Sequence, residues 1–224
     1  MFSILSAGIA PTFALMAFFY LKDRFSEPIG LTLKMFILGA LLVFPIMFIQ
    51  YTFAAEGFSN NAFIYSFLVV ALSEEFFKWF IFLYFIYHHT EFDEHYDGIV
   101  YAVAISLGFA TIENFLYILT NGVEYAFTRA LFPVSSHALF GVIMGFYFGK
   151  SKVGVQLKKW NLFLAFSLPY VLHGLYDYIL LTVTSRWLLL LIPFMIALWL
   201  LGLRSVKVAN QSIDPIFAEN KKQA

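Results

Sequence analysis

Cysteine is absent from the 224-residue chain, and this absence excludes several kinds of functional site. Without thiols, these residues cannot form a disulfide framework, ligate zinc through thiolates or supply a cysteine nucleophile. Charge is also scarce, since 12% of the residues are charged and the 14 Lys and Arg balance the 14 Asp and Glu. Because the net charge is zero and no run of basic residues occurs, the sequence does not favour a nucleic-acid partner.

Apolar residues are abundant instead, at 61% of the chain, and the mean hydropathy is +0.80. No soluble domain of this size buries so large an apolar fraction, so we expect an all-α, polytopic membrane helical bundle surrounded by lipid. No basic segment precedes the first span, which favours a retained helix over a cleaved signal peptide. Hydropathy predicts seven spans, at residues 2–21, 31–53, 62–87, 98–119, 126–149, 161–183 and 187–203.

The distribution of Lys and Arg predicts how this bundle is oriented. Ten of these residues follow the first, fifth and seventh spans, whereas the opposite ends carry Arg129 and Arg186. Since cytoplasmic loops are enriched in Lys and Arg, we expect the N-terminus outside and the C-terminus in the cytoplasm of a multi-pass bacterial plasma-membrane protein. Residues 1–204 would then form one transmembrane domain, and residues 205–224 a polar cytoplasmic tail.

The segment between the third and fourth spans, residues 88–97, contains His88, His89 and His95 among several acidic residues. Histidine and carboxylate side chains together can hold a metal ion. A solvated acidic loop is the commoner explanation of such a segment, and it is the one that we expect.

Two carboxylates and an ammonium interrupt the third span, where Glu74, Glu75 and Lys78 lie within an otherwise almost wholly apolar run. Each charge near a helix centre costs about 2.5–3.5 kcal/mol, so three cost on the order of 8–10 kcal/mol. The fifteen Leu, Ile, Phe and Val residues of the span return roughly 5–9 kcal/mol. Lys78 follows the two Glu at helical spacing and can neutralise either. A simple anchor would not carry these charges, so we predict a functional site.

Four further ionisable residues lie inside other spans: Glu113 in the fourth, His137 in the fifth, and His173 with Asp177 in the sixth. His173 and Asp177 are four residues apart, which puts both side chains on one helix face. At about 1.5 Å per residue, these groups and Glu75 fall roughly 9–20 Å below the outer surface. We therefore expect a single water-filled cavity that opens outward.

Carboxylates and imidazoles in such a cavity suit two hydrolytic schemes, neither of which needs a covalent intermediate. In the first, a Glu near one His acts as general base on water, and a second His stabilises the oxyanion. In the second, two His and one or two Glu bind Zn²⁺, which activates the water. The candidate metal ligands are Glu75, Glu113, His137 and His173.

Structural explanations exist for several of these residues taken singly. His137 could hydrogen-bond a neighbouring helix. Asp177 could orient His173. Glu113 could form an ion pair with Lys78. A purely structural role for all of them at once, as in a non-catalytic membrane scaffold, leaves the cost of burying them unexplained.

A proton-coupled transporter is the alternative function, because its proton relay could use the same buried Glu and His residues. The chain lacks the inverted repeat and the matched pair of broken helices that are typical of such transporters. This absence favours hydrolysis over transport.

Four motifs on separate spans form an ordered set: Glu74-Glu75-x-x-Lys78, Phe109-x-x-x-Glu113, His137 and His173-x-x-x-Asp177. This set resembles the PrsW family of intramembrane proteases, bacterial relatives of the CAAX-processing and Abi proteases. The likeness covers nearly the whole chain and includes residues 92–101 and 141–147.

The resemblance implies a membrane-embedded endopeptidase that makes the first (site-1) cut in the extracytoplasmic part of a single-span anti-sigma factor, the one that restrains sigma-W. Further proteolysis would then release the sigma factor under envelope stress. One of the two adjacent Glu residues would be the general base, and His137 and His173 would polarise water or the carbonyl. Asp177 would orient His173, and Lys78 would hold the Glu pair.

The motifs also depart from those of the wider CAAX-protease group. Where those relatives have Phe-x-x-x-His, this chain has Glu113 in place of the His. Their last motif often ends in Asn, whereas here it ends in Asp177. Their Glu–His pairing therefore does not transfer directly, and the extra carboxylates make a metal ion more plausible here.

Overall fold

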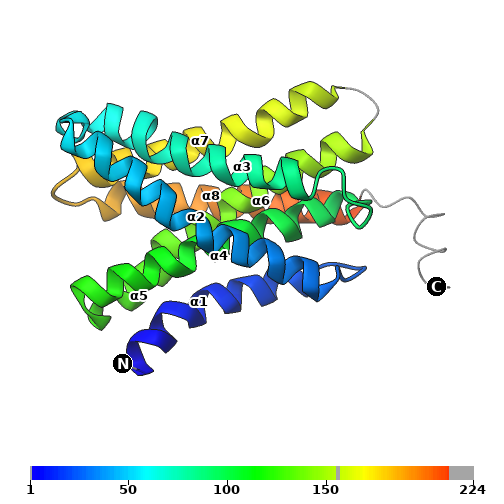
Figure 1. Cartoon of the computed structure of the whole chain (residues 1–224), viewed down its shortest axis with the longest axis horizontal. Helices are drawn as coiled ribbons and strands as arrows, with labels where there is room; N and C mark the ends of the chain where they lie inside the picture. Colours follow the sequence, from blue (N-terminus) through cyan, green and yellow to red (C-terminus); the bar gives the residue numbers. More distant parts are fainter. Residues whose placement is uncertain (1, 155–156, 212–224) are drawn as a thin grey trace.

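The computed structural model of the protein describes residues 2–154 and 157–211, and every regular element in this part of the chain is helical. The prediction of an all-α bundle is therefore confirmed, and the long helices run side by side (Figure 1). The main elements are α1 (Phe2–Tyr20), α2 (Ile29–Ala55), η2 (Ile64–Ala71), α3 (Leu72–Phe85), α4 (His95–Asn121), α5 (Ala126–Arg129), η4 (Ala130–Val134), α6 (Ser135–Val153), α7 (Lys158–Thr182) and α8 (Leu188–Gln211).

Each predicted span corresponds to helical structure, with boundaries that differ by at most four residues, except that α8 extends eight residues beyond the predicted end. Five helical stretches of the described chain are long and apolar enough to cross a membrane, and α1 is a shorter apolar helix. The third predicted span divides into a π-helical segment, η2, and the α-helix α3. Residues 205–211 of the predicted tail belong to α8, whereas residues 212–224 lie outside the described residues.

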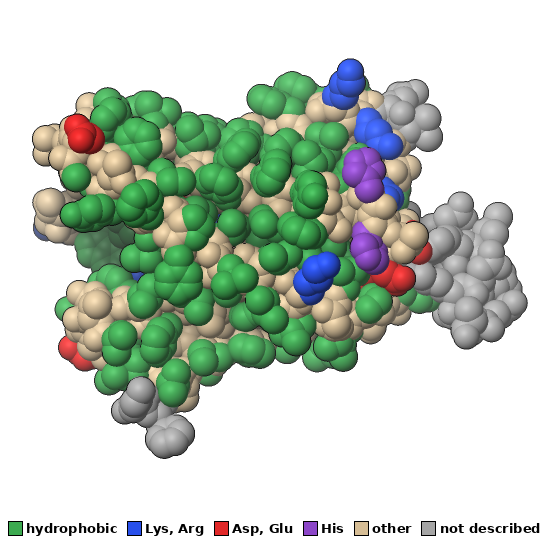
Figure 2. Space-filling view, in the orientation of Figure 1, with side chains coloured by type: hydrophobic (Ala, Val, Ile, Leu, Met, Phe, Trp, Pro, Cys, Tyr) green, Lys and Arg blue, Asp and Glu red, His purple; other side chains and the backbone are tan. Residues whose placement is uncertain are grey.

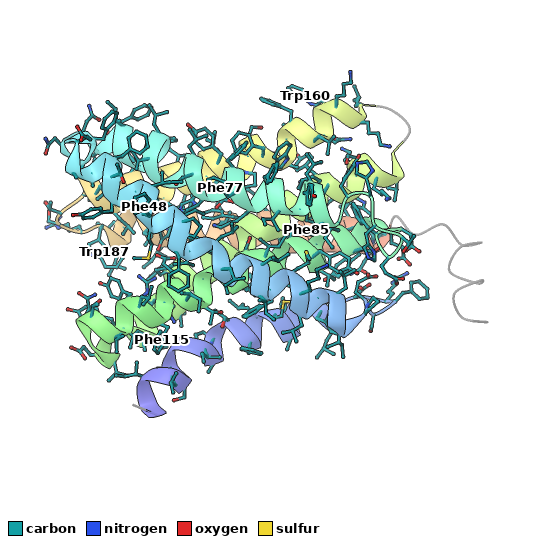
Figure 3. The ribbon with its side chains drawn as sticks, in the orientation of Figure 1. Phe48, Phe77, Phe85, Phe115, Trp160 and Trp187 are labelled. Atoms are coloured by element: carbon teal, nitrogen blue, oxygen red, sulfur yellow. The ribbon has the colours of Figure 1, made fainter. Side chains whose placement is uncertain are left out.

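The outer surface has the pattern of a multi-pass membrane protein. Hydrophobic side chains cover the middle of the visible face, while charged side chains and His gather toward its ends (Figure 2). Large apolar side chains such as Phe48 of α2 and Trp160 of α7 are exposed on this surface (Figure 3). In water such a belt would be unfavourable, whereas lipid chains solvate it well.

The centre of the bundle is α4, which contacts α1, α2 and α6. Its residues 95–111 are all buried. Glycine permits the close approach of α2, because Gly39 faces the backbone of Ile105 and Gly108 faces the backbone of Phe36. Small residues at helix crossings are how membrane helices maximise their packing contacts.

The half of the 88–97 segment that leads into α4 is not solvated, so the expectation of a solvated loop is wrong there. Glu94, His95 and Asp97 are buried. Glu94 and Asp97 cap the start of α4, because the side chain of each accepts a hydrogen bond from the backbone N–H of the other. His95 Nε2 lies 2.9 Å from the carbonyl oxygen of Phe146. The described residues show no grouping of the three His of this segment that could hold a metal.

We predict that Gly108→Ala destabilises the bundle by about 1–3 kcal/mol or more, as overpacking does. A Cβ at this position would lie 1.9 Å from the carbonyl oxygen of Phe36, a backbone atom that cannot rotate away. Equilibrium unfolding in mixed micelles measures the loss. Gly30→Ala is the matched control, since nothing lies within 4 Å of a Cβ there. Equal stability of the two variants would contradict the packing argument.

Candidate active site

The helix α3 carries three charged side chains into the protein interior. Glu74 is 5% exposed, and Glu75 and Lys78 are 0% exposed. Lys78 Nζ donates to Glu75 Oε1 at 2.8 Å and to Glu74 Oε2 at 3.2 Å, as the helical spacing predicts. Gln50 of α2, which sequence reasoning missed, donates from Nε2 to Glu74 Oε1 at 3.1 Å. Each buried carboxylate thus contacts at least one donor.

Two histidines reach this group from other helices, His137 from α6 and His173 from α7. His173 Nδ1 lies 2.9 Å from Glu75 Oε1, and His137 Nδ1 lies 3.2 Å from Lys78 Nζ. The two ring centroids are 5.2 Å apart, with their planes at 89°. Because an ammonium can only donate, His137 Nδ1 accepts, which places the proton of that ring on Nε2.

The other nitrogen of each ring faces a further carboxylate. His137 Nε2 donates to Glu113 Oε2 at 3.0 Å. His173 Nε2 lies 3.3 Å from Asp177 Oδ2 on the next turn of α7. Carboxylates in this position fix the orientation and tautomer of an imidazole. The site therefore contains two carboxylate–histidine pairs whose Nδ1 atoms converge on the charges of α3.

Sequence reasoning also missed Arg129, which it counted as a loop residue. The side chain is buried, and it donates from Nη2 to Glu113 Oε1 at 3.4 Å and from Nε to Asn114 Oδ1 at 2.9 Å. The alternative of a Glu113–Lys78 ion pair is wrong, because Glu113 pairs with Arg129 and a His instead. The available signal was position, since Arg129 falls inside the fifth predicted span, about two helical turns before its His.

A π-helical segment precedes the site residues on two of the helices. η2 leads directly into α3, and η4 leads directly into α6. Pro133 lies in η4 and has no N–H, so α-helical bonding cannot continue through it. Ser136 Oγ donates to the Pro133 carbonyl oxygen at 2.8 Å. Since a π segment rotates the next helical turns about the axis, these two segments set the directions of the Glu pair and of His137.

A cavity of about 120 Å³ lies against this cluster, which is room for a few water molecules. Of the two adjacent Glu residues, Glu74 lines the cavity and Glu75 does not. The residues that line it are Val70, Glu74, Glu113, Arg129, Pro133, Ser136, His137, His173, Tyr176, Asp177 and Leu180. The convergence predicted from residue depth therefore gives a small, polar-lined space beside a buried carboxylate.

The donor set fits a metal ion. Glu74, Glu75, His137 and His173 place ligand atoms within 4.8 Å of one another, and all four residues are buried. Glu75 Oε2 is buried and has no hydrogen-bond partner among the described residues, so it is available as a ligand. Imidazole nitrogens and carboxylate oxygens are ligands that Zn²⁺ accepts. Glu113, a predicted candidate ligand, is not in this group and instead holds His137.

Comparison with known proteins agrees with the motifs. Residues 27–201 match the model of the PrsW family, described as intramembrane metalloproteases. The chain belongs to the PrsW family. This PrsW chain is accordingly a membrane-embedded protease, which also favours hydrolysis over the transporter alternative.

Similarity to individual PrsW relatives extends over nearly the whole chain. It is 60% identical to Protease PrsW of Oceanobacillus iheyensis over 212 residues, which are 95% of this chain and 98% of the relative. It is 53% identical to Protease PrsW of Bacillus subtilis, over 94% of this chain and 97% of the relative. The Clostridioides difficile protein of the same name is 34% identical, over 90% of both chains. No solved structure matches the chain.

We predict that Lys78→Met destabilises this PrsW protein by about 3–5 kcal/mol, because it leaves two buried carboxylates without their ammonium. Lys34→Met is the matched control. Lys34 also lies within a span but is exposed, so its replacement should change the unfolding free energy by less than about 0.5 kcal/mol. Both values come from equilibrium unfolding in micelles. Similar, small losses for both variants would show that Lys78 does not compensate the Glu pair.

Proposed function

We propose that the protein makes the first, site-1 cut in the extracytoplasmic part of a single-span anti-sigma factor, by attack of an activated water molecule on a peptide bond. The supporting observation is the buried Glu–His cluster beside a cavity that holds a few waters. No nucleophilic side chain with an adjacent base is needed for this chemistry. The ordering of the motifs and membership of the PrsW family support the choice of substrate.

Within the cavity, Glu74 is the best placed general base. It lines the space where water would lie, and Gln50 and Lys78 fix both of its oxygens. Glu75 does not line the cavity, and its contacts to Lys78 and His173 suit a role in holding the cluster together. We therefore assign proton removal from the attacking water to Glu74.

The imidazoles supply the positioning. Glu113 accepts from His137 Nε2 and Asp177 lies 3.3 Å from His173 Nε2, so that Nδ1 of His137 faces Lys78 and Nδ1 of His173 faces Glu75. A metal ion, Zn²⁺ by the donor set, would be held by Glu75, His137 and His173, and it would supply water activation and polarisation of the scissile carbonyl. Three protein ligands with an additional Glu as base is the usual composition of a hydrolytic zinc site.

The cut is proposed on the outer side of the membrane. The excess of Lys and Arg after the first, fifth and seventh spans favours the N-terminus outside, which places the cluster between the middle and the outer surface. A substrate segment would then meet the cavity from the extracytoplasmic side, as a first cut in the extracytoplasmic part of the anti-sigma factor requires.

We predict that Glu74→Gln lowers kcat for cleavage by about 10²–10⁴-fold, the usual contribution of a general base. The assay is cleavage of a purified single-span anti-sigma factor by the full-length protein in lipid vesicles, with the products identified by mass spectrometry. Glu56→Gln, which changes an exposed acid at the end of α2, is the control and should cleave like wild type. A folded Glu74→Gln protein with wild-type kcat would remove Glu74 as the base.

The same assay tests the substrate and the side of the cut. Product masses should place the scissile bond in the part of the substrate that lies on the same side of the membrane as the N-terminus of the protease. Products cut on the opposite side would contradict the proposed orientation. Failure to cleave any single-span substrate while the purified protein is folded and metal-loaded would contradict the proposed function.

We predict that prolonged treatment with a strong zinc chelator abolishes cleavage and that stoichiometric Zn²⁺ restores it. The physical reason is the buried set of two imidazoles and two carboxylates, with Glu75 Oε2 available as a ligand. Elemental analysis measures the bound metal before and after treatment. His173→Ala should lose zinc in this measurement, independently of activity. Full activity in protein shown to be free of metal would assign water activation to the Glu–His groups alone.

A further inference from the structure

A second group of acidic residues lies at another end of the bundle, where the α1–α2 connection meets the start of α4. Asp23, Glu27 and Asp97 place carboxylate oxygens within 4.8 Å of one another. Asp97 lies sixteen residues before Glu113 on the same helix, which is about 24 Å along its axis. This group is therefore separate from the candidate active site.

Two members of the acidic group are removed from water. Glu27 is 3% exposed and Asp97 is 0% exposed. No ion pair joins either of them to a Lys, Arg or His of the described chain. Taking a carboxylate out of water without a counter-charge is costly, and two adjacent carboxylates cannot both remain ionised there unaided. The group therefore needs either a shared proton or a cation.

The hydrogen bonds around the group leave one oxygen of Asp97 without a donor among the described residues. Asp97 Oδ2 accepts the backbone N–H groups of Asp93, at 2.9 Å, and Glu94, at 2.6 Å. The Tyr101 hydroxyl donates to Glu27 Oε2. Asp97 Oδ1 is buried and has no hydrogen-bond partner among the described residues. A fully buried carboxylate oxygen without a donor, beside a second buried carboxylate, is the arrangement that a bound cation would satisfy.

We propose that Asp23, Glu27 and Asp97 bind a hard divalent cation, Mg²⁺ or Ca²⁺, which ties the α1–α2 connection to the start of α4. The ligand atoms are all oxygens, which favours these ions over the softer metals that imidazole and thiolate select. The cation supplies the counter-charge that Glu27 and Asp97 lack among the described residues.

The location gives this cation a structural role. Tyr20 near the end of α1 donates its hydroxyl to the Glu27 carbonyl oxygen at 2.5 Å, and the Tyr101 hydroxyl of α4 contacts the Glu27 side chain. Side chains from α1 and α4 therefore already meet at Glu27. A cation on Glu27 and Asp97 adds an ionic link at this junction, and it stabilises the folded bundle by binding that state alone.

We predict that Ca²⁺ or Mg²⁺ raises the thermal midpoint of the full-length protein in detergent and that Glu27→Gln weakens the apparent affinity by about tenfold or more, since it removes one of three anionic ligands. Gln keeps the side-chain volume and an acceptor for the Tyr101 hydroxyl. Asp23→Asn, at a partly exposed position, is the second variant should Glu27→Gln fail to fold. Glu91→Gln, which changes an exposed acid nearby in sequence, is the matched control and should behave like wild type.

Terbium luminescence provides a direct readout, with Tb³⁺ as the Ca²⁺ stand-in and Tyr101 as the nearby sensitiser. Emission should appear with wild type, fall on addition of Ca²⁺ and be lost in Glu27→Gln but kept in Glu75→Gln. No cation-dependent midpoint in wild type would overturn the proposal and assign the pair a shared proton. A shift that persists unchanged in both Glu27→Gln and Asp23→Asn would place the bound cation elsewhere and also overturn it. These readouts do not depend on proteolysis.

Discussion

The ion pair between Glu75 and Lys78 is the constraint on which the site depends. Both side chains are fully buried and their charged atoms lie 2.8 Å apart. Adding Glu74 gives two carboxylates against one ammonium, so the interior needs a further positive charge or a proton donor nearby. His173 lies where it can donate to Glu75 through Nδ1, and together with His137 it could hold a metal ion that supplies the charge. The catalytic chemistry and the stability of the bundle thus draw on the same few atoms.

Placement of this cluster depends on how closely the helices approach. α4 contacts α1, α2 and α6 directly, and glycine allows its backbone to meet that of α2. Direct side-chain hydrogen bonds then connect the helices. Glu113 of α4 accepts from His137 of α6, and Gln50 of α2 donates to Glu74 of α3. Contacts of about 3 Å tolerate little sliding of one helix past another. The tight glycine crossings are therefore part of how the active-site geometry is fixed.

Much of this could be predicted from the sequence because membrane burial makes charge conspicuous. Glu74, Glu75, His137 and His173 stood out by their cost in apolar spans, and the helix rise along the predicted spans placed Glu75, His137 and His173 at similar depth. The seven spans followed from hydropathy for the same reason. Where lipid is the solvent, an ionisable residue inside a span is a strong signal, and the structure brings these residues together.

The remaining features were missed chiefly because they depend on packing in three dimensions. Arg129 was treated as a topogenic charge, but a π-helical segment and the partner Glu113 draw it into the interior. Gln50 carries no charge and gave no signal, although it fixes Glu74. Asp97 was read as part of a solvated loop, because no sequence pattern showed that Glu27, seventy residues earlier, packs beside it. Pairing between distant segments is decided by packing rather than by local composition.

Lys78 supplies the positive charge that the buried Glu pair requires in the structure. Its ammonium contacts both Glu residues and lies 3.2 Å from His137 Nδ1. The lone pair of this nitrogen is the one that a metal ion would need. Without metal, the ammonium supplies the positive charge that the carboxylates require. If His137 held a metal ion, the ammonium would lose only its contact with that ring and would keep the Glu residues three and four positions before it on α3. A Leu at this position would insert into the membrane more easily but would leave the metal-free carboxylates uncompensated.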